Sequence, residues 1–221
     1  MTFHIITLFP GAFESYLGES IIKRAIEDKK IRVKFYDPKD FEKNKKKRVD
    51  DKPYGGGPGM VIRALPVIKA IEKALRNARA GKNKNAPVKI IFLSPSGKDF
   101  TNTYAAATAK KYKHVIIVCG RYEGIDARVK KAFKMEDVSI GPFVLTGGEL
   151  PAMLMIDVIS RQVKGVLGDF TSLEESRIAS PDVYTRPESF EYKGKNFKVP
   201  KVLLSGDHKK IDEWRGKQGQ K

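Results

Sequence analysis

Short runs of β-branched residues alternate with helical patterns through residue 133, and this alternation limits the fold more than any other feature of the chain. The runs are HIITLF at 4–9, IRVKFY at 31–36, VKIIFL at 88–93 and HVIIVC at 114–119. Apolar residues at three- and four-residue spacing lie at 21–26, 64–78, 104–109 and 125–133. Continuous apolar runs are typical of strands buried on both faces, so the order predicts an α/β fold with a parallel sheet.

The rest of the chain is predicted to hold two further helices and a long polar segment. One helix begins at Gly148 or Glu149 and runs through PAMLMIDVISRQV, because a proline is tolerated in a first turn. Residues 169–206 are polar and show no sustained period, so we expect linker and loops there. A last helix over HKKIDEWRGK would be capped by Ser205 or Asp207.

Composition excludes several classes of protein. The single cysteine, Cys119, cannot form an internal disulfide, and 41% hydrophobic residues among 221 are enough for a large core. The longest apolar stretch has about six residues, far fewer than the ~18 to 20 of a spanning helix, so we expect no membrane partner. The N-terminal MTFHIITLFPG has no basic region before its apolar run, and we expect a cytoplasmic protein.

The charge balance points to a polyanion. The chain has 43 Lys and Arg against 26 Asp and Glu, a net charge of +17, and +15 of this excess falls within residues 1–165. This exceeds what solubility requires and indicates a partner such as nucleic acid, bound mainly by that part. The alternative is a lysine-rich surface that is only well solvated.

Two glycine-bearing segments follow predicted strands, and a third contains a β-type run that bends at Gly141 and Pro142. They are LSPSG (93–97), CGRYEGID (119–126) and SIGPFVLTGGELPAM (139–153). Because ligands of open parallel sheets bind at the carboxyl ends of the strands, the segments predict one small-molecule pocket with walls of backbone. Each segment alone could be an ordinary strand-to-helix turn. Cys119 is expected to be a small buried residue, and no spacing of Cys or His fits a metal site.

A fourth glycine-rich segment, VDDKPYGGGPGM (49–60), directly follows the basic run KNKKKR (43–48). Its glycines allow the chain to wrap closely around a flat or charged group, and the neighbouring cations could contact phosphate. The segment lacks the lysine and hydroxyl of a P-loop and the spacing of a Rossmann fingerprint. A surface loop without a ligand is the alternative, and the glycine count alone favours it.

An ordered set of motifs covers nearly the whole chain: FPGAF, VDDKPYGGGPGM, LSPSG, CGRYEGID, SIGPFVLTGGELPAM, YTRP and VLLSGDH. It resembles the bacterial tRNA (guanine-N(1))-methyltransferases, a family of the SPOUT class that uses S-adenosyl-L-methionine. The resemblance implies a parallel-sheet α/β domain with a C-terminal trefoil knot (1–161), a flexible linker (162–183) and a small, mainly helical domain (184–221). It also implies an obligate homodimer with shared active sites, which methylates N(1) of the guanosine 3′ to the tRNA anticodon.

The same resemblance assigns the binding residues. The cofactor is expected against Leu93, Ser94, Pro95, Gly120, Arg121, Tyr122, Glu123, Ile140, Gly141, Leu145, Gly147 and Gly148. The tRNA is expected to contact Asp50, Gly55, Gly56, Gly57, Pro58, Gly59, Lys46 and Arg48. No DNA partner is expected. The resemblance allows for magnesium, although no dedicated metal cage is visible.

The catalytic residues are implied in the same way. Arg161 matches the family's catalytic arginine, although without the match it would be interpreted as a cation at a helix C-terminus. In the family, the aspartate that acts as the catalytic base falls in the stretch that is LEES here, which places Glu175 at its position. The linker is short here, so Glu174 and Asp169 stay open as alternatives.

Further departures from the family pattern leave two other functions open. Thr146 stands where a serine is expected, and the basic segment that follows WRxKQ in the family is not seen before Lys221. One alternative is an RNA-binding SPOUT descendant without methyl transfer, which would fit the glutamate at the position of the catalytic base and the short C-terminus. The other is ribose 2′-O-methylation, the activity of related knotted enzymes. The glycine segments and Arg161 favour an enzyme, and YGGGPGM favours guanine N(1).

Overall fold

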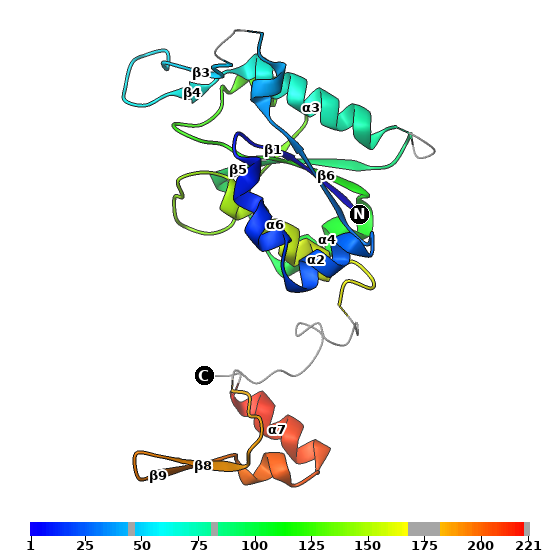
Figure 1. The fold of residues 1–221 in the computed structure, drawn as a ribbon, viewed down its shortest axis with the longest axis vertical. Coiled ribbons are helices and arrows are strands. Elements are labelled where there is room, and N and C mark those ends of the chain that lie inside the picture. The colour runs from blue at the N-terminus through cyan, green and yellow to red at the C-terminus, as the bar shows by residue number, and fades with distance from the viewer. Residues whose placement is uncertain (44–46, 81–83, 168–181, 219–221) are drawn as a thin grey trace. The chain divides into compact units, whose positions relative to one another are not determined.

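The computed structural model describes residues 1–43, 47–80, 84–167 and 182–218. The chain divides into two compact units, Met1–Gly168 and Asp169–Lys221, each with its own elements (Figure 1). The boundaries of the expected linker, 162–183, stay a prediction. Among the described residues, no helix is long and apolar enough to cross a membrane.

The first unit contains the strands and helices of an α/β fold. In chain order they are β1 (Thr2–Ile6), η1 (Pro10–Phe13), α1 (Glu14–Leu17), α2 (Ser20–Glu27), β2 (Arg32–Tyr36), η2 (Pro38–Phe41), β3 (Asp50–Asp51), β4 (Val61–Ile62), α3 (Ala64–Ala78), β5 (Val88–Asp99), α4 (Asn102–Lys111), β6 (His114–Val118), α5 (Arg128–Ala132), β7 (Glu136–Ser139) and α6 (Glu149–Arg161).

Five of these strands form one sheet in the order β2-β1-β6-β5-β7, and all neighbours are parallel. The strands begin in register, because Thr2 pairs with both Arg32 and His114, and His114 also pairs with Val88. The predicted α/β class with a parallel sheet is confirmed.

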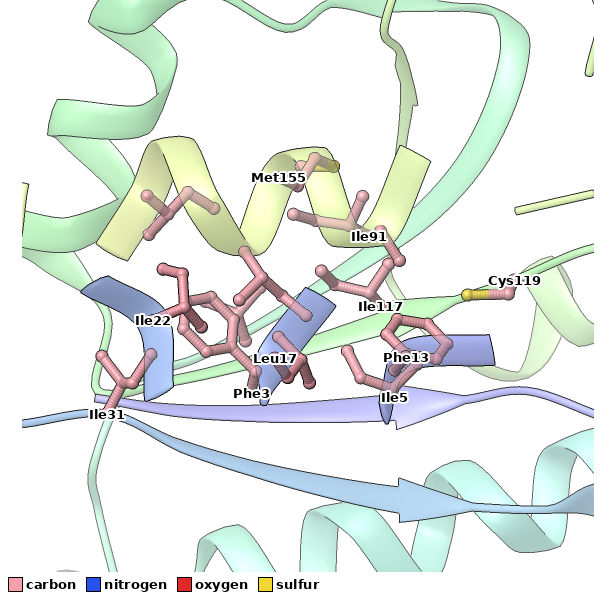
Figure 2. Close-up of a cluster of buried hydrophobic side chains, with 14 of the residues drawn as sticks. Phe3, Ile5, Phe13, Leu17, Ile22, Ile31, Ile91, Ile117, Cys119 and Met155 are labelled. Carbon is pink, nitrogen blue, oxygen red and sulfur yellow. The ribbon is translucent and has the colours of Figure 1, made fainter. Parts of the chain in front are cut away.

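Helices cover both faces of the sheet because successive strand residues point to opposite sides. Phe3 and Ile5 face a cluster completed by α1, α2, α4 and α6, and Figure 2 shows Met155 of α6 in that cluster. The alternate residue Ile6 faces α3 and α5 on the other side, together with Ile116 and Val118. Burial on both faces explains the nearly continuous apolar runs of the central strands β1 and β6.

The segment LSPSG is not an ordinary strand-to-helix turn. It lies within β5, which continues to Asp99. Leu93 and Lys98 both pair with Val138 of β7, so the residues between them form a bulge. Gly97 passes the backbone of Val138 so closely that no side chain would fit. The alternative of an ordinary turn is therefore excluded for LSPSG, whose first three residues line the cavity described below.

The second unit holds a hairpin that the sequence did not indicate. Its elements are β8 (Ser189–Tyr192), β9 (Lys195–Lys198), η5 (Lys201–Leu204) and α7 (His208–Gln218). Lys193 and Gly194 join the strands with φ of 50° and 71°, as in a type I′ turn. The expectation of loops up to residue 206 was therefore wrong for the hairpin. The last helix is confirmed, and Asp207 accepts a hydrogen bond from the N–H of Lys210 at 3.2 Å.

Candidate functional site

A cavity of about 310 Å³ opens at the carboxyl edge of the sheet in the first unit. Its walls come from the three glycine-bearing segments, which lie far apart in the sequence. All twelve residues expected at the cofactor line it: Leu93, Ser94, Pro95, Gly120, Arg121, Tyr122, Glu123, Ile140, Gly141, Leu145, Gly147 and Gly148. The structure thus brings these residues together, and their role at a cofactor stays a prediction.

Two of the cavity segments are joined directly through their backbones. The N–H of Gly148 donates to the carbonyl of Gly120 at 2.9 Å, and Arg121 pairs with Gly147 in an antiparallel bridge. A Cβ on Gly148 would lie 2.6 Å from Cα of Cys119. Glycine is therefore required at this position by the close approach of two chain segments.

A buried carboxylate connects these segments to the end of β1. Glu149, the first residue of α6, is only 3% exposed. Its carboxylate accepts hydrogen bonds from Oγ1 of Thr7 at 2.7 Å and from Nε of Arg121 at 2.9 Å. The Arg121 guanidinium also donates to the carbonyl of Thr146 and lies 4.6 Å from the ring centre of Phe9. Sequence reasoning missed Thr7, Phe9 and Glu149; the acidic residue in the first turn of α6 was the available signal.

The GGGPG segment lies against the same cavity. Residues 52–60 connect the antiparallel pair β3 and β4, and Gly55, Gly56, Gly57 and Gly59 all have positive φ. The N–H of Glu123, a cavity residue, donates to the carbonyl of Met60 at 3.0 Å, and the N–H of Ile62 donates to that of Gly124. The loop is thereby fixed beside one wall of the cavity.

The tRNA residues expected around this loop are placed as follows. Asp50 is paired with Nε of Arg48 at 3.2 Å. The glycines and Pro58 are exposed in the loop, as is Tyr54, which was not among the expected residues. Lys46 lies outside the described residues. The nearby cation Arg63 is paired with Glu42 at 2.5 Å.

Cys119 lies behind the cavity and is buried, as expected. Burial raises the pKa of its thiol well above the usual value, and the nearby Glu149 carboxylate raises it further. A thiol held in its neutral form is a poor nucleophile. The structure therefore agrees with a packing role for this residue.

Of the two expected catalytic residues, the structure describes Arg161, which does not line the cavity of its own chain. Arg161 is the last residue of α6, whereas Glu149 is the first. At 1.5 Å per residue, the two ends of this helix are about 18 Å apart. Glu175 and the alternatives Glu174 and Asp169 lie outside the described residues.

The residues of the cavity fit the methyl donor that the resemblance implies. Leu93, Pro95 and Leu145 supply apolar surface, while the backbone N–H groups of Ile140 and Leu145 have no hydrogen-bond partner among the described residues. A Cβ on Gly120 would meet nothing closer than Ile125 at 4.0 Å, so open space lies beside that backbone. Within the described parts of the chain, no group of three or more His, Cys, Asp or Glu could hold a metal ion.

A parallel α/β unit with a backbone-walled cavity at the carboxyl edge of its strands defines a class of small-molecule-binding α/β proteins. Comparison with known proteins is more specific. The profile of the family described as tRNA (Guanine-1)-methyltransferase TrmD matches residues 1–221. The chain belongs to this family.

Individual relatives agree with the family match over nearly the full length. A protein of Clostridioides difficile named tRNA (guanine-N(1)-)-methyltransferase is 47% identical over 219 residues, which are 97% of this chain and 90% of the relative. Proteins with the same name from Buchnera aphidicola and Carboxydothermus hydrogenoformans are 44% and 43% identical. They cover 98% and 99% of this chain, and the matches cover 88% and 82% of those relatives.

Proposed function

We propose that this protein transfers a methyl group from S-adenosyl-L-methionine to N(1) of the guanosine 3′-adjacent to the anticodon in tRNA. Family membership over the whole chain supports the activity, and the relatives' name specifies tRNA and guanine N(1). One observation carries the proposal. The loop expected to recognise the target base is held to the wall of the expected cofactor cavity by the backbone hydrogen bond between Glu123 and Met60. This contact supports a methyl donor and a target base that bind side by side. A tRNA substrate also agrees with the expected cytoplasmic location.

The cavity residues would hold the cofactor through backbone and apolar contacts. The N–H groups of Ile140 and Leu145 are available for the adenine and the methionine arm, and Leu93 and Pro95 offer apolar surface. The bonds of Arg121 to Glu149 and Thr146 would fix the shape of the walls. When bound, S-adenosylmethionine supplies an activated methyl group, so correct positioning contributes much of the rate. Magnesium assistance is not part of this proposal.

The chain's own side chains would supply the acid–base chemistry. Guanine N(1) carries a proton at neutral pH, so a carboxylate must accept it as the nitrogen attacks. Glu175 is the proposed base, with Glu174 and Asp169 as alternatives. Arg161 would stabilise the negative charge that develops on the exocyclic oxygen of guanine.

A homodimer with shared active sites is part of the same proposal. Within one chain, Arg161 is about 18 Å along α6 from the cavity, too far to contact a base that reacts there. In a dimer, Arg161 of the second subunit would contact the reacting base instead. The outer side of α6 offers apolar contact surface, because Leu150 and Leu154 are 57% and 39% exposed and the nearby Val144 is 82% exposed. The C-terminal trefoil knot and the domain limits 1–161, 162–183 and 184–221 also belong to this proposal.

Labelled methyl transfer to two tRNA transcripts tests the function. One transcript carries guanosine 3′ of the anticodon and the other adenosine. We expect labelling of the first alone, its loss in Glu175→Ala and partial retention in Glu175→Asp. If Glu174→Ala or Asp169→Ala abolishes transfer while Glu175→Ala does not, the base is assigned wrongly. If the wild-type protein binds the cofactor and tRNA and transfers nothing, the function itself is contradicted.

A further inference from the structure

The positive charge of the first unit is concentrated at the edge of the sheet opposite the cavity. At the cavity edge, cations are mostly matched by carboxylates. The pairs there are Lys39–Asp37, Lys47–Asp40, Arg48–Asp50, Arg63–Glu42, Arg121–Glu149, Arg128–Asp126 and Lys130–Asp137. Each of these seven cations thus has a carboxylate partner.

The opposite edge carries ten exposed cations, which we call the amino-edge surface. They are Lys29, Lys30, Arg32, Lys34, Arg76, Arg79, Lys84, Lys110, Lys111 and Lys113. None of them has a carboxylate within 4.0 Å among the described residues. In the same described segments, the acidic residues next to them are Glu27 and Asp28.

Backbone hydrogen bonds fix several of these cations side by side. The N-terminal ammonium donates to the carbonyl of Lys30 at 2.9 Å. The N–H of Thr2 donates to the carbonyl of Lys113 at 2.9 Å, and the N–H of Lys113 donates to that of Pro87 at 3.2 Å. The segments that precede β2, β1, β6 and β5 therefore lie next to one another, beside the N-terminus marked in Figure 1.

The titration of nearby groups agrees with a positive potential at this edge. Burial and then the charges of Lys113 and Arg32 lower the pKa of the N-terminal ammonium. Burial also lowers the pKa of His114, and the charges of the N-terminus and Lys34 add to the effect. Such crowding of like charges raises the free energy of the unbound protein through repulsion, and a bound polyanion would relieve this repulsion.

We propose that the amino-edge surface binds backbone phosphates of the tRNA substrate outside its anticodon arm. The proposal rests on the proposed function. Five residues of parallel strand, about 17 Å, separate this edge from the cavity edge, so the phosphates that it meets are remote from the reacting base. Its side chains are lysine and arginine, which suits phosphate contact without base readout. A second copy of the chain would not dock here, because the two surfaces would repel each other.

A triple variant tests the proposal against a matched control. Lys30→Gln, Lys84→Gln and Lys113→Gln remove three charges from the segments before β2, β5 and β6. The control, Lys23→Gln, Lys73→Gln and Lys131→Gln, removes three exposed charges from α2, α3 and α5. Binding and methyl transfer are measured with full-length tRNA and with an isolated anticodon stem-loop, over a range of salt concentrations.

We expect the test variant to bind full-length tRNA about tenfold more weakly. The slope of log affinity against log salt concentration, which counts the ions released on binding, should fall by about two to three, as three lost phosphate contacts predict. Its affinity for the stem-loop and its kcat at saturating tRNA stay unchanged. Equal losses for both RNAs, or losses no greater than in the control, overturn the proposal. Absence of transfer by the wild-type protein instead contradicts the proposed function.

Discussion

Glu149 is the buried carboxylate on which the geometry of the cavity depends. Its bonds to Thr7 and Arg121 connect β1, α6 and the segment after β6. We expect Glu149→Gln to lower the free energy of unfolding by about 2 kcal/mol, because a charged acceptor of two hydrogen bonds is replaced by a neutral amide. Affinity for S-adenosylmethionine should fall with it.

Urea unfolding and calorimetric titration of the cofactor measure both effects of this substitution. Glu123→Gln is the control for stability, since Glu123 also lines the cavity but is exposed. It should change stability by no more than about 0.5 kcal/mol. Equal effects of the two substitutions would show that the Glu149 contacts are not special.

His4 makes stability depend on pH. It is buried between the Tyr36 hydroxyl at 2.9 Å and Nδ1 of His114 at 3.0 Å, and Asn77 donates to the same hydroxyl. Burial, with the charges of His114 and Lys34, lowers the pKa of His4 to about 4. The folded state therefore prefers neutral His4, so its contribution is complete above the unfolded pKa of about 6.5 and is lost as pH falls from there towards 4.

Unfolding free energies at pH 7.0 and 5.0 test this dependence. We expect a loss of about 2 kcal/mol for 1.5 pH units below the unfolded pKa. His4→Gln should be less stable at pH 7.0 but show a smaller change with pH. His208→Gln, at an exposed site of α7, should behave as the wild type. A wild-type slope that persists in His4→Gln would contradict the assignment.

At the scale of elements, the cavity depends on how closely its segments pass. A Cβ at Gly148 would lie 2.6 Å from Cα of Cys119 and 3.0 Å from the backbone nitrogen of Gly120. Gly148→Ala should therefore force these segments apart, at a cost of about 1 to 3 kcal/mol. Gly11→Ala, where a Cβ would meet nothing within 4 Å, is the control and should be nearly neutral. Thermal unfolding of both variants measures these stabilities, and an equal stability of the two would contradict the prediction.

A substitution at Gly120 is expected to change cofactor binding without changing the stability of the fold. A Cβ there would meet nothing closer than 4.0 Å, and the residue lines the cavity. We expect Gly120→Ala to keep the stability of the wild type and to weaken S-adenosylmethionine binding severalfold, because the new methyl group occupies ligand space. Unchanged affinity, measured by titration calorimetry, would place the cofactor elsewhere.

The elements show what the sequence could and could not predict. The strands at 2–6, 88–99 and 114–118 were found because burial of their central residues leaves apolar runs, whereas the largely exposed strand at 32–36 was found from its β-branched and aromatic residues. The hairpin of β8 and β9 was missed because its strands are exposed on both sides and carry no such pattern. The twelve cavity residues came from the family resemblance, whereas the Glu149–Arg121 pair depends on side-chain contacts between segments that no spacing along the chain reveals.

At the scale of the whole molecule, the distance between Arg161 and the cavity along α6 predicts complementation between subunits. Arg161→Ala should leave cofactor binding intact and abolish transfer, and Gly120→Leu should block the cavity. Each variant alone should be inactive. Co-expressed, half of the dimers would be mixed, with one intact site in two, so activity should recover to about a quarter of the wild-type value.

This recovery requires that mixed dimers form, which differently tagged subunits verify by co-purification. Inactivity of purified mixed dimers would mean that cavity and Arg161 act within one chain or that Arg161 has another role. A monomeric wild-type protein in sedimentation would contradict the shared site outright.

The central claim concerns the product, and nucleoside analysis tests it most directly. A tRNA transcript with guanosine 3′ of the anticodon is incubated with the protein and S-adenosylmethionine, digested to nucleosides and examined by mass spectrometry against standards. The account predicts 1-methylguanosine in wild-type reactions and its absence with Arg161→Ala. Detection of 2′-O-methylguanosine, or of no methylated nucleoside at all, would contradict the account.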